Sequence, residues 1–303
     1  MALAPNRNRK LWLNHGYFRT YQIAARISAI ASDPIAYIRE LEDLTVDNAV
    51  LAFLPAWQKE SVVHKFAKWI SDEIFIEDTS GPYVISDEVV EDGSFTHKRY
   101  LPVDLALRAY GISNHEPFAV PPPDGEMVRV KENVREWVES GVVADACYDY
   151  FMEDLRLSQV YDDLQAQIAD EVFHTMFFNR VALGGLNRCL AMYVCDLAPD
   201  DLGEYPEFAA LLAKPGRLKR KRPPVWARRA VFFRDHGRCA ACGTDLSGLL
   251  DALPHEQFDH IIPLARGGLN DVTNLQLLCR RCNNKKSDRA RQPSSQYRRL
   301  YEL

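Results

Sequence analysis

Apolar residues recur at helical spacing over much of the chain. Residues 11–28 place side chains such as Phe18 and Ile27 on one side of a helix. Asp33-Pro34 then has the order of an N-cap followed by a proline at the first helical position, which predicts a new helix start. Similar patterns predict further helices over 35–41, 56–75, 157–178 and 186–197. The N-terminal two-thirds of the chain is therefore expected to be mainly helical.

One stretch of this region departs from the helical pattern. Tyr83-Val84-Ile85 and Lys98-Arg99-Tyr100-Leu101 flank an acidic turn at 91–94, in which Asp-Gly marks a tight bend. This arrangement predicts a small β-hairpin. Three consecutive prolines followed by Asp-Gly, at 121–125, predict an exposed break, and residues 133–195 are expected to be helical again.

Glycine, proline and basic residues divide the last third of the chain. Gly184-Gly185 is predicted to interrupt the helical pattern, and residues 214–224 combine four Pro and Gly residues with six Lys and Arg. That composition predicts a charged linker without regular structure. A helix is expected over 225–235, with Phe233 on its apolar side and Arg234 elsewhere.

The 303 residues are enough for two domains, and charge separates two parts of the chain. Residues 214–303 carry 19 Lys and Arg against 8 Asp and Glu, whereas residues 1–213 carry 18 against 34. A basic module joined to an acidic one points to a polyanionic partner for the basic module alone. We therefore expect an α+β protein with a mainly helical, acidic regulatory or recognition domain at 1–213, a basic linker at 214–224 and a second domain at 225–303.

The sequence also bears on the compartment. No run of 18 or more apolar residues occurs, and no apolar core of a signal peptide follows the basic start, so we expect no membrane partner. Cys147, Cys189 and Cys195 lie in apolar surroundings and are predicted to be buried thiols. Metal-type spacing of the other four cysteines without a secretory signal indicates the cytoplasm.

Four cysteines form two closely spaced pairs. Cys239-Ala-Ala-Cys242 and Cys279-Arg-Arg-Cys282 are separated by 36 residues. Two such pairs supply the four thiolates of a tetrahedral structural Zn²⁺ site. The pairs therefore predict a zinc site that holds the C-terminal domain together.

The polar residues between and after these pairs exceed what a zinc site needs. They comprise Asp259-His260-Ile-Ile-Pro263, then Gly267-Gly268, then Asn274-Leu275, and Asn283 with Lys286 beyond the last cysteine. In this order the motif resembles the HNH nuclease family, which has the ββα-metal fold, over roughly residues 225–290. Asn283 stands where the family has either histidine or asparagine.

The resemblance implies a role for each of these residues. His260 would be the general base that activates water, and Asp259 with Asn283 would bind a catalytic Mg²⁺ or Mn²⁺. Amide and carboxylate oxygens favour these hard ions. Asn274 would tie the loop between the two strands, and Lys286 would contact a phosphate near the scissile bond. The zinc would be structural, because a closed site with four cysteines has no open position for water.

Basic residues around the motif are candidates for contact with the phosphate backbone of DNA. Some lie in the linker, and others lie near the Gly-Gly turn or on a final helix predicted over 283–291. The candidates are Lys219, Arg220, Lys221, Arg222, Arg266, Lys285 and Arg289.

The sequence thus predicts a metal-dependent DNA endonuclease or nickase. By resemblance, fusion of an HNH domain to an unfamiliar helical domain indicates a restriction or anti-phage effector. Its N-terminal domain would regulate the nuclease and bind a protein partner or a second copy of the chain. Two alternatives stay open, a non-catalytic zinc-dependent nucleic-acid-binding adaptor and a nuclease acting on structured RNA. An adaptor would have no use for Asp259 and His260, and no RNA-recognition motif is present.

Overall fold

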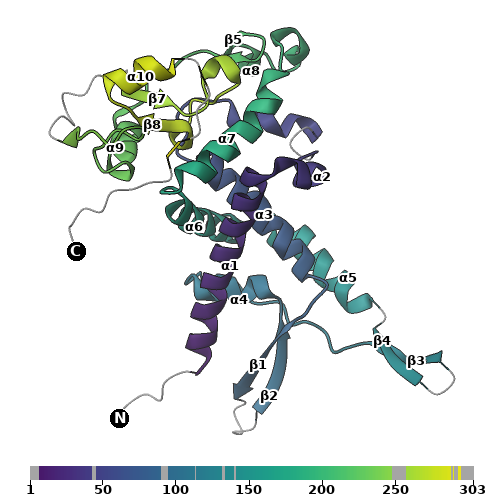
Figure 1. Ribbon diagram of the computed structural model, residues 1–303. Coiled ribbons are helices and arrows are strands. Elements are labelled where there is room, and N and C mark those ends of the chain that lie inside the picture. Colours follow the sequence, from purple (N-terminus) through teal and green to yellow (C-terminus); the bar gives the residue numbers. More distant parts are fainter. Residues whose placement is uncertain are drawn as a thin grey trace, which may run out of the picture. The chain divides into compact units, whose positions relative to one another are not determined.

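The computed structural model describes residues 7–42, 46–89, 95–112, 114–131, 134–139, 141–247, 257–287, 289 and 293–294. The described chain is mostly helical and carries small antiparallel strand pairs (Figure 1). The predicted α+β class, mainly helical toward the N-terminus, agrees with this composition. In the described part of the chain, every helix is too short or too polar to cross a lipid bilayer.

The helices differ widely in length. In chain order they are α1 (Arg7–Ser32), α2 (Ile38–Leu41), α3 (Val62–Asp78), α4 (Pro102–Ala109), α5 (Val142–Asp149), α6 (Gln159–Met176), α7 (Arg180–Cys195), α8 (Pro206–Ala209), α9 (Val225–Arg234) and α10 (Arg280–Lys286). Asp33 caps a short 3₁₀ turn, Pro34–Tyr37, that leads into α2, and its carboxylate accepts from the Ala36 N–H. The predicted helix start at Asp33-Pro34 is therefore confirmed.

Four antiparallel strand pairs occur in the described chain. They are β1 (Val84–Val89) with β2 (Phe95–Tyr100), β3 (Gly125–Lys131) with β4 (Val134–Glu139), β5 (Leu212–Lys214) with β6 (Arg217–Leu218), and β7 (Phe258–His260) with β8 (Leu275–Leu277). The first pair confirms the predicted hairpin, although its acidic turn at 91–94 lies outside the described residues. The second pair was not predicted.

The β3–β4 pair corrects the expectation that the helical pattern resumes at residue 133. Gly125–Lys131 and Val134–Glu139 pair in antiparallel register, with Met127 opposite Trp137. Val128-Arg129-Val130-Lys131 alternates apolar and polar residues, which is the period of a strand, whereas Val134, Trp137 and Val138 have helical spacing. This spacing in the second segment explains why the sequence pattern predicts a helix there.

The chain forms two compact units. One consists of Met1–Ile23 with Ala67–Glu171, and the other of Ala24–Phe66 with Val172–Leu303. The complete HNH-like motif lies in the second unit, together with helix α7. The functional division at residues 214–224 that the sequence suggested stays a prediction.

The first unit contains a buried polar cluster around Asp104 of helix α4. Its Oδ1 lies 2.9 Å from both His115 Nε2 and Tyr150 Oη, and its Oδ2 accepts from the Phe118 N–H at 3.2 Å. The Phe118 and Tyr150 rings stack with centroids 4.5 Å apart. Burial raises the pKa of Asp104 in spite of these bonds. The cluster therefore fixes the loop after α4 by partners that only the fold brings together.

Helix α7 is the buried helix of the second unit, and it passes through Gly184-Gly185 without a break. The predicted interruption is therefore wrong. A Cβ on Gly185 would lie 2.2 Å from the Ala31 carbonyl oxygen, and one on Gly184 would lie 3.3 Å from Ile261 Cγ2. These glycines thus allow close packing of neighbouring segments. Cys189 of this helix is buried as predicted, as is Cys147 of the first unit, but Cys195 is exposed.

Helix α3 starts at Val62 and not at residue 56 as predicted. Trp57 has a φ of +57°, which is incompatible with a right-handed helix. Ser61 precedes the helix, and its N–H donates to His64 Nδ1 at 3.1 Å. This local bond and the Trp57 conformation set the helix start. Both depend on contacts that the apolar pattern does not reveal.

The linker is only partly irregular, which corrects the expectation that it has no regular structure. Strands β5 and β6 turn at Gly216, whose φ is +65° and whose N–H donates to the Leu197 carbonyl at 2.8 Å. A Cβ at Gly216 would lie 2.6 Å from the Cys195 carbonyl oxygen, so the turn requires glycine. Residues 219–224 have no regular structure, as predicted.

Helix α9 confirms the prediction over 225–235, but its buried face differs from the expected one. Ala227, Val231 and Arg234 are buried, whereas Phe233 is 65% exposed. Positions 227, 231 and 234 share a face at spacings of four and three residues. The sequence pattern does not reveal this face, because a charged residue is expected at the surface. Arg234 is buried here because the partners described below satisfy its charge.

Candidate active site and metal centre

The four motif cysteines come together at one place. Their Sγ atoms all lie within 4.8 Å of one another, and Cys242 Sγ lies 3.7 Å from Cys279 Sγ. A tetrahedral zinc with Zn–S bonds of about 2.3 Å would separate its sulfurs by about 3.8 Å. The donor set and spacing thus fit Zn²⁺. Among the described residues, this is the group of cysteine, histidine and acidic side chains close enough to hold a metal.

Backbone hydrogen bonds place the two cysteine pairs. The Ala240 N–H, in the first pair, donates to the Leu277 carbonyl of β8 at 2.8 Å. Cys279 precedes helix α10, and its carbonyl accepts from the Asn283 N–H at 2.9 Å. A hydrogen bond with the Thr244 hydroxyl lowers the pKa of Cys242 to about 6, which favours the thiolate that binds metal.

The candidate catalytic pair lies on strand β7. Asp259 pairs with Gln276 and His260 with Leu275 across the β7–β8 ladder. Strand β7 is short, and His260 is its last residue. Successive side chains of a strand point to opposite faces, so Asp259 and His260 reach different surroundings.

Asn274 joins the two ends of the loop between β7 and β8. Its Oδ1 accepts from the Ile262 N–H at 2.8 Å, and its Nδ2 donates to the Ile262 and Leu269 carbonyls at 3.0 and 2.9 Å. The side chain is fully buried, with an exposure of 0%. All polar atoms of this side chain are therefore hydrogen-bonded to the backbone, at Ile262, two residues after His260, and at Leu269, further along the loop.

The loop also has its own close approach. A Cβ on Gly268 would lie 2.0 Å from the Ile262 carbonyl oxygen, and Gly267 has a φ of +75°. Both glycines of the predicted turn are thus required, one for space and one for conformation.

Lys286 lies beneath Asp259 and faces inward from α10. Its Nζ is 2.8 Å from Asp259 Oδ2 and 2.8 Å from the His260 carbonyl oxygen, which accepts a hydrogen bond from it. Only 4% of Lys286 is exposed. Asp259 Oδ2 also accepts from Gln276 Nε2 at 3.3 Å. Among the described residues these bonds use Oδ2 alone, so Oδ1 is available to a ligand.

The His260 ring is buried, with 2% of the residue exposed. Neither ring nitrogen has a hydrogen-bond partner among the described residues. Burial lowers the pKa of His260 to about 3, and the positive charges of Arg220 and Lys286 act in the same direction. The imidazole is therefore neutral at physiological pH.

Two adjacent cavities open at these residues. The larger has a volume of about 440 Å³ and is lined by Arg220, Asp259, Asn283, Asn284 and Ser287. The smaller has a volume of about 170 Å³ and is lined by Arg217, Arg220, Asp259, His260, Pro263, Leu264, Ala265 and Ser287. Asp259 and Asn283, the predicted metal ligands, thus border one cavity, and His260 borders the other beside Asp259.

This donor set is compatible with a hard divalent cation. A carboxylate and an amide, one from a strand and the other from helix α10, offer oxygen ligands to the same cavity. Mg²⁺ and Mn²⁺ are bound by few protein oxygens and complete their shells with water and substrate phosphate. The assignment of these two residues as ligands stays a prediction.

Trp57 and Asn270 are site residues that the motif did not reveal. The Trp57 ring lies 6.1 Å from the His260 ring between centroids, and the backbone N–H of Trp57 donates to the Asn270 backbone carbonyl at 2.8 Å. No sequence signal marks Trp57, which precedes α3 and is about 200 positions from His260. Asn270 lies within the motif region but outside the recognisable positions.

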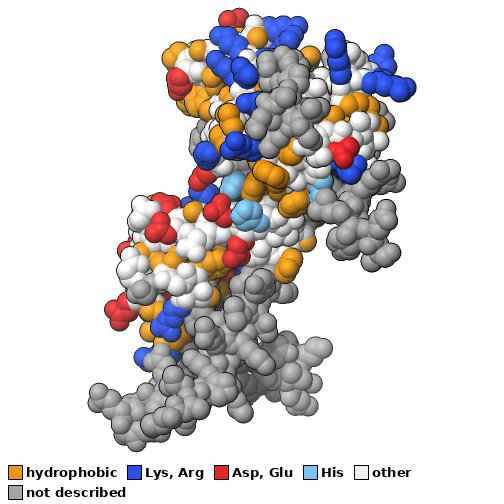
Figure 2. All heavy atoms as spheres, turned by 90° about the vertical axis from the view of Figure 1, so that its left-hand side faces the viewer, with side chains coloured by type: hydrophobic (Ala, Val, Ile, Leu, Met, Phe, Trp, Pro, Cys, Tyr) orange, Lys and Arg blue, Asp and Glu red, His pale blue; other side chains and the backbone are white. Residues whose placement is uncertain are grey.

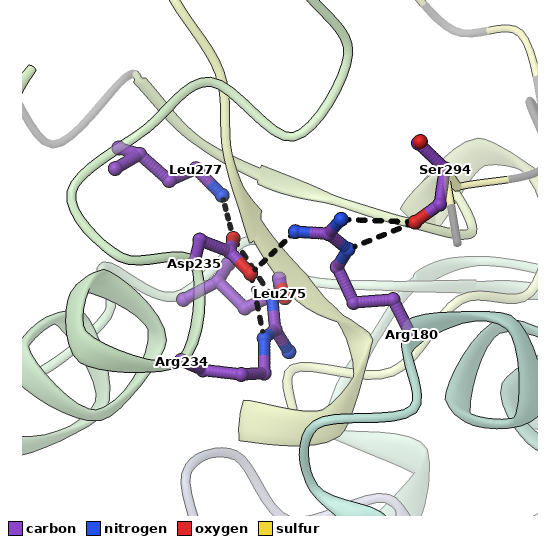
Figure 3. Close-up of polar contacts among 6 residues, drawn as sticks. All are labelled: Arg180, Arg234, Asp235, Leu275, Leu277 and Ser294. Carbon is purple, nitrogen blue, oxygen red and sulfur yellow. Dashed lines mark hydrogen bonds and ion pairs between the residues drawn. The ribbon is translucent and has the colours of Figure 1, made fainter. Parts of the chain in front are cut away.

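A buried ionic network contacts the backbone of strand β8 (Figure 3). The Asp235 carboxylate accepts from Arg234 Nε at 2.9 Å, Arg180 Nη1 at 3.2 Å and the Leu277 N–H at 2.9 Å. Arg234 Nη2 also donates to the Leu275 carbonyl at 2.7 Å. Both ends of β8 are thus held by α9 and the residue after it. Charged residues at a helix end gave no sign of this role.

The predicted DNA-binding residues are all exposed, but they do not all line the cavities. Those on the surface are Lys219, Arg220, Lys221, Arg222, Arg266, Lys285 and Arg289. Helix α10 ends at Lys286. Arg289 therefore lies beyond the helix, and the prediction that the final helix includes it is wrong. Figure 2 shows Lys and Arg side chains gathered over the unit that contains β7, β8 and α10. Only Arg220 of this set lines the cavities described above.

The HNH endonuclease family model matches residues 239–289. Comparisons with curated proteins and with solved structures found no match. The family match confirms the resemblance predicted from the motif, and it covers both cysteine pairs and the strands between them. The C-terminal part of the chain thus carries an HNH domain, which indicates a metal-dependent nuclease acting on nucleic acid.

Proposed function

We propose that the protein is a DNA endonuclease that hydrolyses one strand at a time. His260 is the general base, and Asp259 and Asn283 hold one Mg²⁺ or Mn²⁺. The observation that carries this proposal is that Asp259 lines both cavities, the larger one together with Asn283 and the smaller one together with His260. A divalent cation held there would neutralise charge on the phosphate and assist departure of the 3′ oxygen.

The residues of the chain itself prepare this reaction. In this proposal the neutral imidazole of His260 takes the proton of the attacking water. Asn274 holds the backbone just beyond His260 through three hydrogen bonds. Lys286 was predicted to contact phosphate, but its Nζ is bound to Asp259 and to the His260 carbonyl. We therefore assign Lys286 a positioning role.

The four cysteines hold a structural Zn²⁺ in this proposal. All four ligand positions are occupied by sulfur, so zinc takes no part in hydrolysis. Its contribution is to fasten the start of α10, which carries Asn283, to the segment that bonds with β8.

DNA is the proposed substrate because seven exposed basic residues belong to the unit that contains the two cavities. Lys219, Lys221, Arg222, Lys285 and Arg289 would track the phosphate backbone by counterion release. Arg266, also exposed, would contact a flanking phosphate. Structured RNA is the alternative substrate, and an adaptor without catalysis is the alternative function. The neutral imidazole next to a carboxylate favours hydrolysis over the adaptor.

Residues 1–213 have a regulatory or recognition role in this proposal. Their excess of acidic residues contrasts with the basic C-terminal part and suits a partner other than DNA. A protein partner or a second copy of the chain would bind here, and the protein would serve as a restriction or anti-phage effector in the cytoplasm.

The test is nicking of supercoiled plasmid by the full-length protein with Mg²⁺ or Mn²⁺. His260→Ala is expected to lose nicking while it keeps its zinc, and His97→Ala, at an exposed histidine, is expected to nick like the wild type. A folded RNA hairpin serves as the alternative substrate. Nicking that persists in His260→Ala would show that the general base is misassigned.

DNA binding without cleavage by the wild type, in either metal, would favour the adaptor. Cleavage of the RNA hairpin alone would replace DNA with RNA as the substrate. Zinc content measured on each variant separates loss of catalysis from loss of the fold.

A further inference from the structure

Arg220 is the basic side chain that borders both cavities of the candidate active site. It lines the larger cavity with Asp259 and Asn283, and the smaller one with Asp259 and His260. Its charge is near enough to contribute to the low pKa of His260. Arg222, two positions further along the linker, lines neither cavity. The basic linker therefore contains one residue at the reaction centre and others outside it.

The backbone on both sides of Arg220 is anchored to the HNH domain. Asn270 Nδ2 donates to the Lys219 carbonyl at 3.0 Å, and Asn270 Oδ1 accepts from the Lys221 N–H at 3.3 Å. Asn270 itself is buried, with 4% exposed. One side-chain amide thus clamps the segment with Arg220 at its centre. This clamp fixes the point from which the Arg220 side chain enters the cavities.

The charges around Arg220 suit an anion. Among the described residues, no carboxylate pairs with the Arg220 guanidinium, whereas Asp259 is paired with Lys286 at 2.8 Å. Arg217 adds a second positive charge to the wall of the smaller cavity. A guanidinium can donate two parallel hydrogen bonds to a phosphate, which makes arginine the suitable residue for this position.

We propose that Arg220 is a catalytic residue that binds the scissile phosphate, and that Asn270 is its positioning residue. This inference rests on the proposed nuclease function. In the reaction, a bond forms between the water oxygen and phosphorus, and the bond from phosphorus to the 3′ oxygen breaks. His260 takes the proton of the water, and the leaving 3′ oxygen takes a proton from solvent. Arg220 exchanges no proton and stabilises the negative charge on the phosphate oxygens.

Plasmid nicking by full-length variants separates this role from general attraction of DNA. Arg220→Ala is expected to lower kcat about 10²–10³-fold, as loss of a donor to a developing oxyanion does. Arg222→Ala is expected to raise KM and to reduce the salt dependence of DNA binding by about one phosphate contact. Arg229→Ala, an exposed arginine of α9 away from the cavities, is the control for loss of surface charge.

Two further variants sharpen the comparison. Arg220→Lys keeps the charge but not the paired donors, so it is expected to recover only part of kcat. Asn270→Ala releases the clamp and is expected to lower kcat as Arg220→Ala does, with DNA affinity retained. If Arg220→Ala and Arg222→Ala both affect KM alone, Arg220 is only part of the DNA-tracking surface and the inference is overturned.

A second measurement does not depend on cleavage. Binding of inorganic phosphate, without added divalent metal, is followed by isothermal titration calorimetry. Arg220→Ala is expected to weaken it at least about tenfold, and Arg222→Ala to leave it in place. Loss of phosphate binding in Arg220→Ala by a protein that nicks no DNA would refute the nuclease and retain the phosphate site. Equal phosphate binding in Arg220→Ala and the wild type, or none in the wild type, overturns the inference.

Discussion

Replacement of Asp235 by alanine should lower the unfolding free energy of the second unit by more than the loss of an exposed ion pair would. The Asp235 side chain is fully buried, as is Arg234, and the Arg180 side chain is 3% exposed. The carboxylate accepts from both guanidinium groups and from the Leu277 N–H. Its removal would take the carboxylate away from two buried guanidinium groups and from one strand N–H.

The expected loss is about 3–5 kcal/mol of unfolding free energy, the usual cost of removing one partner of a buried ion pair. This is a large fraction of the total stability of a domain, which is about 5–15 kcal/mol. Asp235→Asn keeps an acceptor for Leu277 but loses the charge, so its loss should be smaller. Nicking activity should fall with stability, because Leu277 and the other β8 residues pair with the strand that carries Asp259 and His260.

Urea unfolding followed by circular dichroism at constant zinc concentration measures these differences. Glu40→Ala is the matched control in the same unit, since Glu40 and Arg26 form an ion pair at 2.8 Å with side chains 36% and 47% exposed. Its loss should be below about 1 kcal/mol. If Asp235→Ala lost no more than this control, the network of Figure 3 would not be holding strand β8, and the reasoning would be wrong.

Two further predictions concern the metal centre and the first unit. Cys279→Ser should lower the bound zinc and the melting temperature of the protein, because structural zinc contributes folding free energy and only three thiolates would remain; unchanged zinc content by metal analysis would contradict the site. Burial raises the pKa of Asp104, so the folded state holds its proton more tightly than the unfolded state, and this group costs stability as pH rises from about 4 through its folded pKa. Asp104→Asn removes that cost and should gain stability relative to the wild type between pH 4 and pH 7 in urea unfolding; a constant difference across this range would contradict the assigned cause.

Local sequence patterns predicted the elements whose determinants are close together in the chain. The Asp33-Pro34 start, the β1–β2 hairpin and helix α9 follow from caps, turns and periodicity over a few residues. Elements are harder to predict where contacts with a neighbouring segment determine the structure. Gly184-Gly185 predicts a helix break, yet it lies inside α7. Glycine is suited to these positions because Ala31 and Ile261 approach them closely.

The motif likewise predicted which side chains gather, because its spacing is fixed by a small fold. Two cysteine pairs two residues apart can supply four sulfurs to one ion, and the structure brings them within 4.8 Å of one another. The Asp259-His260 pair and Asn283 could be placed at one site from their positions in the motif. Their catalytic roles stay predictions.

The tertiary structure alone decided what surrounds that motif. Arg220 reaches the cavities because Asn270 holds the chain on both sides of it, and Trp57 reaches His260 through its bond to the same residue. Lys286 turned out to serve Asp259 and the His260 backbone, since its side chain is buried. Such contacts join residues far apart in sequence, and they depend on complementary shape and charge that appear only after the chain has folded. The sequence determined which chemical groups are available to this site, and tertiary packing determined which charged side chains border it.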